Sequence, residues 1–315
     1  MILSTLGRRA LLGGAAAGLL AAPASAQERT LRIGYQKYGT LVLLKGRGTL
    51  EQRLHGEGVR VAWTEFPSGP ALLEAMNVGA IDLGTVGEAP PVFAQAAGTP
   101  VLYVAHEPPA PRGEAILVQR DSPVRSVADL RGKKVAFNKG SNVHYLLVRA
   151  LEAAGLRYTD IEPATLPPAD ARVAFERKQV DAWAIWDPFL AAAEAATGAR
   201  QLADGTGLVS NHQFYMATER FAAANGPLVD AVVTALADTA AWVSGDIPSA
   251  ARTLSPGVGI PAPILEAAMR RQAYGVRPLD AAVAAEQQRI ADTFHGLGLI
   301  PRPVRVADAV RQTGA

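Results

Sequence analysis

The stretch with the clearest capacity for chemistry is 135–155, which reads VAFNKGSNVHYLLVRALEAAG. A short apolar strand breaks at Gly140 and the chain reopens as a helix. A helix N-terminus carries unpartnered N–H groups and the positive end of the helix dipole, so it attracts anions. Gly140 allows close backbone approach, Ser141 and Asn142 can cap or donate, and His144 follows one turn later. The pattern predicts an anion-binding turn, although an ordinary capped helix has the same residues.

Two further polar segments lie at predicted strand ends. Gln36 follows the first strand, and Ser68-Gly69 opens the next helix. A solvated loop amide would account for Gln36, and a plain helix N-cap would account for Ser68. These alternatives are as good as a ligand site when the residues are taken singly.

The elements that must position these residues alternate between strand and helix from residue 31 to about residue 196. From Phe221 onward the pattern is nearly all helical. Alternation of this kind predicts an α/β fold with mostly parallel sheets covered on both faces. Strands are expected at 31–35, 59–66, 81–86, 101–106, 114–119, 134–138 and 182–185, and helices at 41–54, 69–77, 91–97, 143–154, 168–178, 188–196, 227–245, 248–254, 261–274 and 279–297.

Two segments interrupt this alternation and are expected to be lobe boundaries. The first, 107–113, is too rich in proline for a helix or a central strand, and the second is 209–218. We therefore predict two doubly wound α/β lobes joined by two crossovers, with a helical C-terminal tail. Lobe 1 would comprise residues 27–112 plus 214–315, and lobe 2 residues 113–213. Ligands of open α/β sheets bind beyond the carboxyl ends of the strands, where the residues above lie.

The first 26 residues have the features of a cleaved signal peptide. Arg8 and Arg9 precede an apolar run, and Ala24-Ser25-Ala26 is a small-residue cleavage site. The arginine pair favours twin-arginine export, with general secretion as the alternative. The two arginines also account for the formal net charge of +2. We expect an exported, soluble periplasmic protein without a lipid anchor, since no cysteine follows the signal.

Composition excludes several classes of protein. The chain has no cysteine, so it has no disulfide, thiolate metal site or cysteine nucleophile. Its five histidines have no metal-ligand spacing, and no phosphate loop or Gly-x-Ser-x-Gly elbow is present. No basic stripe suggests nucleic acid. We expect no metal, no cofactor and no catalysis, while a carboxylate-based hydrolase stays open as the rival class.

A colinear series of motifs points to one family. The chain resembles the aliphatic-sulfonate-binding periplasmic proteins of ABC importers from about Leu31 to about Pro303. That resemblance implies the type II periplasmic-binding-protein fold and an organosulfonate ligand. It also implies delivery to an ABC permease and its ATPase in the inner membrane, for use as a sulfur source, by a monomer. The motifs are GYQK (34–37), EFPSGPALLEAMNVGAIDLG (65–84), EAPPVFAQAAG (88–98), EPP (107–109), VADLRGKKVAFNKGSNVHYLLVRALEAAGL (127–156), PADARVAF (168–175) and VDAWAIWDPF (180–189).

The resemblance also assigns site residues. Gly87 and Glu88 occupy the position where the family places a polar residue facing the cleft, although Glu88 would repel a sulfonate unless it meets a cation or a donor. Trp186 could wall the alkyl chain, and Asp187 could face a ligand amine or cap the next helix. The predicted ligand-binding residues are Gln36, Ser68, Gly69, Gly87, Glu88, Gly140, Ser141, Asn142, His144, Trp186 and Asp187.

The identity of the anion stays open at this point. Alkanesulfonate is favoured, with taurine, nitrate or an aryl sulfonate as alternatives and an enzyme on the same fold as a further one. Because the site would be a surface cleft, we expect neither Ser141 nor His144 in the core. We also expect His144 to be neutral, donating one N–H.

Overall fold

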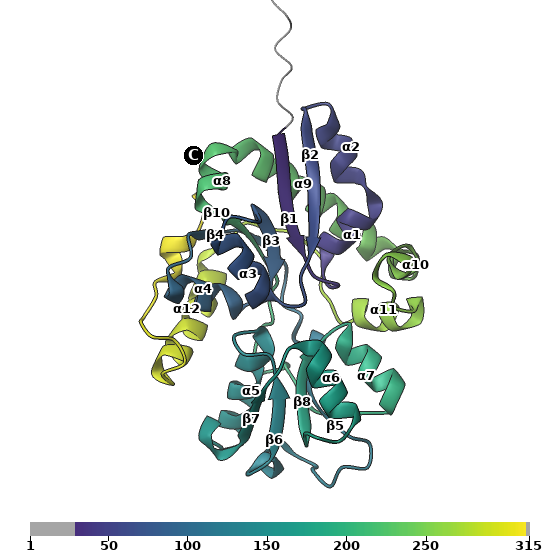
Figure 1. Cartoon of the computed structure of the whole chain (residues 1–315), viewed down its shortest axis with the longest axis vertical. Coiled ribbons are helices and arrows are strands. Elements are labelled where there is room, and N and C mark those ends of the chain that lie inside the picture. The colour runs from purple at the N-terminus through teal and green to yellow at the C-terminus, as the bar shows by residue number, and fades with distance from the viewer. Residues whose placement is uncertain (1–28, 313–315) are drawn as a thin grey trace, which may run out of the picture.

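The computed structural model describes residues 29–312, so the predicted signal peptide at 1–26 lies outside the described residues. Two α/β lobes are stacked along the long axis (Figure 1), each with a five-stranded sheet. We call the unit around the β2-β1-β3-β10-β4 sheet lobe 1, and the unit around the β7-β6-β8-β5-β9 sheet lobe 2.

Lobe 1 is built from both ends of the described chain, as the sequence colours in Figure 1 show. The helix expected at 41–54 is divided in two, because Gly48 adopts a left-handed φ of 64° that ends the first helix. The strands are β1 (Arg29–Tyr35), β2 (Val59–Glu65), β3 (Leu83–Val86), β4 (Val101–His106) and β10 (Phe214–Thr218). The helices are α1 (Thr40–Arg47), α2 (Thr49–His55), α3 (Gly69–Asn77), α4 (Pro90–Ala97), α8 (Glu219–Ala224), α9 (Gly226–Gly245), α10 (Ile247–Val258), α11 (Ala262–Met269) and α12 (Ala281–Gly296).

Lobe 2 contains two strands, β7 and β9, that the apolar pattern did not predict. Both are partly exposed edge strands, so they lack a continuous apolar run. The strands are β5 (Glu114–Val118), β6 (Lys134–Phe137), β7 (Glu162–Thr165), β8 (Ala182–Trp186) and β9 (Arg200–Asp204), and the helices are α5 (Asn142–Ala153), α6 (Pro168–Glu176) and α7 (Phe189–Thr197).

Each sheet is mostly parallel, as predicted, with one strand in five reversed. In lobe 1, β10 inserts antiparallel between β3 and β4, and in lobe 2, β5 lies antiparallel between β8 and β9. Both strands follow a crossover, and they run in reverse because the chain enters each sheet from the opposite lobe. The segment 214–218, expected to belong to a boundary, is therefore a fully buried strand of lobe 1. The α/β fold class is confirmed, and the single reversed strand in each sheet is the detail that the sequence did not predict.

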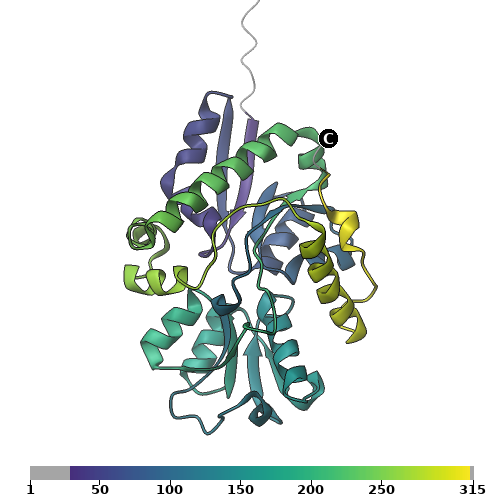
Figure 2. The same cartoon turned by 180° about the vertical axis from the view of Figure 1, so that it is seen from behind.

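One helix among residues 29–312, α9, is long and apolar enough to span a membrane by length and composition. It packs against α1 and contributes apolar side chains to the lobe 1 core, among them Val229, Val232 and Leu236. Seen from behind in Figure 2, α9 crosses the face of lobe 1. Its apolar character is explained by that burial.

Candidate ligand-binding site

The predicted ligand-binding residues gather where the two lobes meet. Loops after β1 and β3 and the start of α3 come from lobe 1, and the start of α5 and the end of β8 come from lobe 2. All eleven residues are buried. The lobes touch here, because a methyl group added to Gly87 would lie 2.9 Å from Cγ of Asn142. One added to Gly140 would lie 3.5 Å from Cγ of Phe93 on α4. The structure therefore shows the lobes closed on each other.

The turn before α5 has the geometry of an anion seat. Gly140 adopts φ +77°, a left-handed conformation that favours glycine. Ser141 is the extended N-cap residue, and its hydroxyl donates to the Asn138 carbonyl at 2.7 Å. That hydroxyl proton is thus unavailable to a ligand in this arrangement. The backbone N–H groups of Ser141 and His144 already donate to the carbonyls of Asn138 and Ser141. The donors that the turn can offer are therefore the backbone N–H groups of Asn142 and Val143 at the start of the helix.

Asn142 joins the lobes at the hinge. Its side-chain amide donates to the Glu114 carboxylate and to Oδ1 of Asn211 at 3.0 Å. Asn211 in turn donates to the carbonyl of Ala110 at 2.9 Å, so the network connects the two crossovers. Burial, followed by the charge of Glu88, raises the pKa of the Glu114 carboxyl well above its usual value. Burial at the hinge therefore favours the neutral form of the Glu114 carboxyl.

His144 is fully buried, and the expectation that it lies outside the core was wrong. Its ring stacks on Phe137 with centroids 4.8 Å apart and contacts Phe294 at 5.2 Å. Nδ1 accepts the Gly140 N–H at 3.3 Å. Burial, followed by the charge of Lys139, lowers the pKa of His144 to about 4. The ring is therefore neutral, with its proton on Nε2. Through Nδ1 it holds the backbone of the turn at Gly140.

Ser141 is likewise buried rather than exposed in an open cleft. The reason is the same for both residues: closure of the lobes covers the first turn of α5. Whether either side chain contacts ligand stays a prediction.

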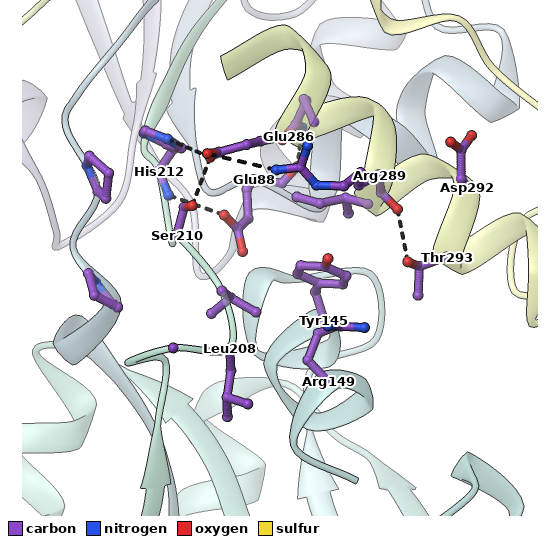
Figure 3. Close-up of a pocket in the computed structure, with 16 residues that line it drawn as sticks. Glu88, Tyr145, Arg149, Leu208, Ser210, His212, Glu286, Arg289, Asp292 and Thr293 are labelled. Carbon is purple, nitrogen blue, oxygen red and sulfur yellow. Dashed lines mark hydrogen bonds and ion pairs between the residues drawn. The ribbon is translucent and has the colours of Figure 1, made fainter. Parts of the chain in front are cut away.

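Glu88 turns toward the hinge rather than toward the α5 turn. Its side chain is 1% exposed, and Oε2 accepts the backbone N–H of His212 at 3.3 Å. Burial raises the pKa of Glu88 to about 8. In Figure 3 its carboxyl points into a pocket of about 610 Å³ between α12, α5 and the second crossover. The sequence left open what Glu88 faces, and in this structure it faces the pocket.

Trp186 and Asp187 end β8 in buried positions. Trp186 meets Phe189 edge to face, with ring centroids 6.2 Å apart. Oδ1 of Asp187 accepts the Ala191 N–H at 3.0 Å, which is the capping role left open by the sequence. Burial raises the pKa of Asp187 to about 7. The carboxyl is therefore poised between its charged and neutral forms near neutral pH.

Gln36 and Ser68 complete the lobe 1 side. The Gln36 amide donates to the carbonyl of Thr85 at 3.1 Å, which fixes it against the end of β3. Ser68 is the extended N-cap residue of α3, and its side chain forms no capping hydrogen bond. Its hydroxyl is thus free to take another partner. Pro70 in the first turn of α3 removes one N–H donor from that end.

A cation that sequence reasoning missed spans the lobes. Arg271, just after α11 of lobe 1, pairs with Glu194 on α7 of lobe 2 at 2.5 Å and with Asp187 at 3.5 Å. Helix α11 packs on α7, so the ion pair lies where these helices meet. The signal was the charged pair at 270–271 directly after the apolar α11.

The hinge itself contains buried polar groups that no sequence motif indicated. Tyr215 donates its hydroxyl to Glu107, whose pKa is raised by burial. The carbonyl of Glu107 contacts Nδ1 of His106 at 3.0 Å and Nδ1 of His212 at 2.8 Å. Within residues 29–312, no group of three or more His, Cys, Asp or Glu side chains could hold a metal ion. The arrangement is suited to binding an anion between two movable lobes.

The chain is similar to known proteins along nearly its whole length. Residues 55–249 match the NMT1/THI5-like family. The chain is 44% identical to an aliphatic-sulfonate-binding protein of Escherichia coli (strain K12), over 96% of this chain and 95% of that protein.

Two solved structures extend the match to three dimensions. The alkanesulfonate-binding protein from Xanthomonas axonopodis pv. citri, bound to MOPS, superposes with a TM-score of 0.86 at 45% identity, covering 92% of this chain and 100% of that one. The periplasmic aliphatic sulphonate binding protein from Escherichia coli gives 0.82 at 45% identity, covering 91% of this chain and 93% of that one.

Proposed function

Because this chain belongs to the NMT1/THI5-like family and, within it, to the aliphatic-sulfonate-binding proteins, we propose that it captures an alkanesulfonate between its two lobes. One observation carries this proposal: identity of 44–45% to such binding proteins over more than nine-tenths of the chain. The relative bound to MOPS supports the ligand class, since MOPS is a propanesulfonate with a morpholine ring at its other end.

The physical chemistry of the ligand agrees with the α5 turn. A sulfonate is ionised at every physiological pH, so its site needs hydrogen-bond donors and no proton switch. The first turn of α5 supplies backbone N–H groups and the positive end of a 12-residue helix. Closure would then bring Gln36 and Ser68 of lobe 1 to the other side of the anion. Trp186 offers an apolar wall for the alkyl chain.

We further infer that the protein is exported to the periplasm, where it works as a monomer. It would deliver its ligand to an ABC permease and the associated ATPase in the inner membrane, as part of sulfur acquisition. The E. coli relative of known structure is a periplasmic protein. The signal-like sequence at 1–26 supports export of this chain as well.

A panel of ligands tests the proposal. Purified protein freed of ligand is heated with C1 to C8 alkanesulfonates, taurine, sulfate, nitrate and an aryl sulfonate. A ligand of the folded state raises stability by RT ln(1 + [L]/Kd), so the rank of melting shifts follows affinity. We expect the largest shifts from alkanesulfonates. Equal shifts from sulfate or nitrate, or none from any sulfonate, would contradict the proposal.

The same samples separate binding from catalysis. We expect each sulfonate to be recovered intact after incubation with the protein. Release of sulfite would show that the protein is an enzyme that cleaves the sulfonate.

A further inference from the structure

The pocket on the hinge side has the size and position of a second ligand site. Its volume of about 610 Å³ falls within the range of small-molecule sites. Figure 3 shows that it is enclosed by α12 of lobe 1, α5 of lobe 2 and the crossover 207–212. A molecule held there would touch both lobes and the hinge at once.

The floor of this hinge-side pocket is acidic and incompletely satisfied. Glu88 is 1% exposed, and its Oε1 has no hydrogen-bond partner among the described residues. Its other oxygen accepts the backbone N–H of His212 at 3.3 Å, and the backbone N–H of Asn211 also favours the charged form of this carboxyl. A buried acceptor without a partner is costly, so it is a strong point of attachment for a donor. Because burial raises the Glu88 pKa to about 8, the empty pocket leaves this carboxyl largely protonated at neutral pH.

A second carboxylate reinforces the acidic floor. Oε2 of Glu286 accepts the hydroxyl of Ser210 at 2.7 Å and contacts Nε2 of His212 at 3.2 Å. These donors come from the crossover, whereas Glu286 lies on α12. The negative charge of Glu286 also contributes to the raised pKa of Glu88. A positively charged group beside Glu88 would offset both the burial of its carboxyl and the repulsion from Glu286.

Two exposed arginines also line the pocket. The side chains of Arg149 and Arg289 are 40% and 66% exposed, in contrast to the buried Glu88. Arg149 pairs with Glu152 at 2.6 Å, and Arg289 is 3.8 Å from Glu286. Tyr145 projects from α5 into the pocket, as Figure 3 shows. The lining thus combines the carboxyl groups of Glu88, Glu286 and Asp292 with the guanidinium groups of Arg149 and Arg289.

We propose that the hinge-side pocket binds a small zwitterionic amine, with its ammonium group on Glu88 and its anionic group facing Arg149 and Arg289. A metal ion is not the cation, because the described residues here do not provide a cluster of metal ligands. A diamine would place its second positive charge near Arg149 and Arg289, so a zwitterion fits better. An ammonium also has N–H donors for the orphan oxygen of Glu88.

This second site is distinct from the α5 turn, because Glu88 is the one residue of the pocket lining that also belongs to the predicted sulfonate site. The proposal therefore goes beyond capture of a sulfonate and does not depend on it. A ligand that contacts both lobes only when they are closed would favour closure, and by linkage it would raise sulfonate affinity.

Titration calorimetry with carboxylate zwitterions tests the proposal on the intact mature protein. The probes are glycine, 4-aminobutanoate and 6-aminohexanoate, with butanoate and butylammonium as single-charge controls. We expect at least one zwitterion to bind, and to bind at least tenfold tighter than either control. It should also bind when an alkanesulfonate is saturating. Absence of binding by all three zwitterions, or loss of binding under saturating sulfonate, would overturn the proposal.

Glu88→Gln is the decisive variant, since glutamine keeps the acceptor for the His212 N–H but cannot pair with an ammonium. We expect at least tenfold weaker binding of the zwitterion and an unliganded melting temperature at or above that of the wild type. Glu57→Gln, at an exposed position of lobe 1, should bind as the wild type does. Equal affinity in wild type and Glu88→Gln would refute the role of Glu88.

A second measurement needs no variant. An ammonium on Glu88 favours its carboxylate, so binding at pH 7 should release up to about one proton. The measured enthalpy should then change with the ionisation enthalpy of the buffer. A buffer-independent enthalpy would overturn the assignment of the ammonium to Glu88.

Discussion

At the scale of single residues, the lobe interface holds ionisable groups in their neutral or half-neutral forms. Burial lowers the pKa of His144 to about 4 and raises that of Asp187 to about 7. A permanently charged ligand therefore meets mostly neutral donors and the backbone of α5. His144 is neutral throughout the physiological range. We therefore expect that its titration leaves sulfonate affinity nearly unchanged from pH 6 to pH 8.

The buried His144 makes a testable contribution to stability. An unfolded histidine titrates near 6.5 and this one near 4, so the unfolded state binds more protons between those values. Stability conferred by the neutral ring is complete above pH 6.5 and is lost as pH falls toward 4. The expected loss is about 3 kcal/mol. Urea titrations of wild type and His144→Phe across this range measure it.

His144→Phe is the matched variant because phenylalanine keeps the stack on Phe137 and cannot titrate. Its stability should fall less than that of the wild type between pH 6.5 and pH 4, by about the same 3 kcal/mol. Other buried carboxyls, such as Asp187, titrate in both proteins and cancel in the difference. Parallel pH profiles for the two proteins would show that the histidine is accessible to protons when folded.

At the scale of elements, the turn from β6 to α5 determines where the helix N-terminus points. Gly140→Ala should force a side chain into a left-handed conformation and destabilise the protein by roughly 1–2 kcal/mol. Crowding is not the cause, since the nearest atom to the added methyl group would be 3.5 Å away. Because the strained turn carries the proposed anion seat, alkanesulfonate affinity should fall at least fivefold in calorimetry.

Gly132→Ala provides the control for that prediction. Gly132 also has a left-handed φ, of 68°, and open space around it, but it lies at the opposite end of β6. It should cost similar stability and leave affinity unchanged. Should both variants bind as the wild type does, the anion seat would have to lie elsewhere.

The contact between α7 and α11 is the second element with a mechanical role. Arg271 and its partners Glu194 and Asp187 lie on opposite lobes, so the ion pair forms only when the lobes are closed. Arg271→Met removes it, and partly buried pairs of this kind contribute on the order of 1 kcal/mol. Sulfonate affinity should fall by about fivefold to tenfold.

Arg270→Met is the neighbouring control, because Arg270, directly after α11, is exposed and pairs with Glu266 of its own lobe. Its affinity for the sulfonate should match the wild type. The same loss of affinity in both variants would mean that general surface charge, rather than the α7–α11 ion pair, is responsible.

At the scale of the whole molecule, closure buries the candidate site completely, so ligand must enter through a more open arrangement. Two crossovers provide the hinges, and the second one, 205–213, carries Asn211 in a positive-φ conformation. We expect ligand-free protein in small-angle scattering to have a larger radius of gyration than the closed structure. Saturating alkanesulfonate should reduce it to the closed value.

Two results would contradict this picture of closure. The radius of gyration could match the closed structure without ligand, which would mean that the cleft is closed beforehand. It could instead stay large at saturation, which would mean that a single lobe holds the anion.

Much of the architecture follows from local patterns in the chain. The apolar run of β6, the break at Gly140 and the helical period after it predicted the turn within a residue of where it lies. The same local signals placed α3, β4 and most of the C-terminal helices. The family was confirmed for the same reason, since its motifs are contiguous and occur in order along the sequence.

Contacts between distant residues could not be derived in this way. The insertion of β10 between β3 and β4, the burial of His144 against Phe294, and the pairing of Arg271 with Glu194, 77 residues apart, depend on how the lobes pack. Periodicity shows which face of an element is apolar but not which partner covers it. Likewise, the sequence placed Glu88 at the cleft, and only the tertiary structure turned its carboxyl toward the hinge. Closure of two lobes, each assembled from separate stretches of chain, decided what these side chains meet.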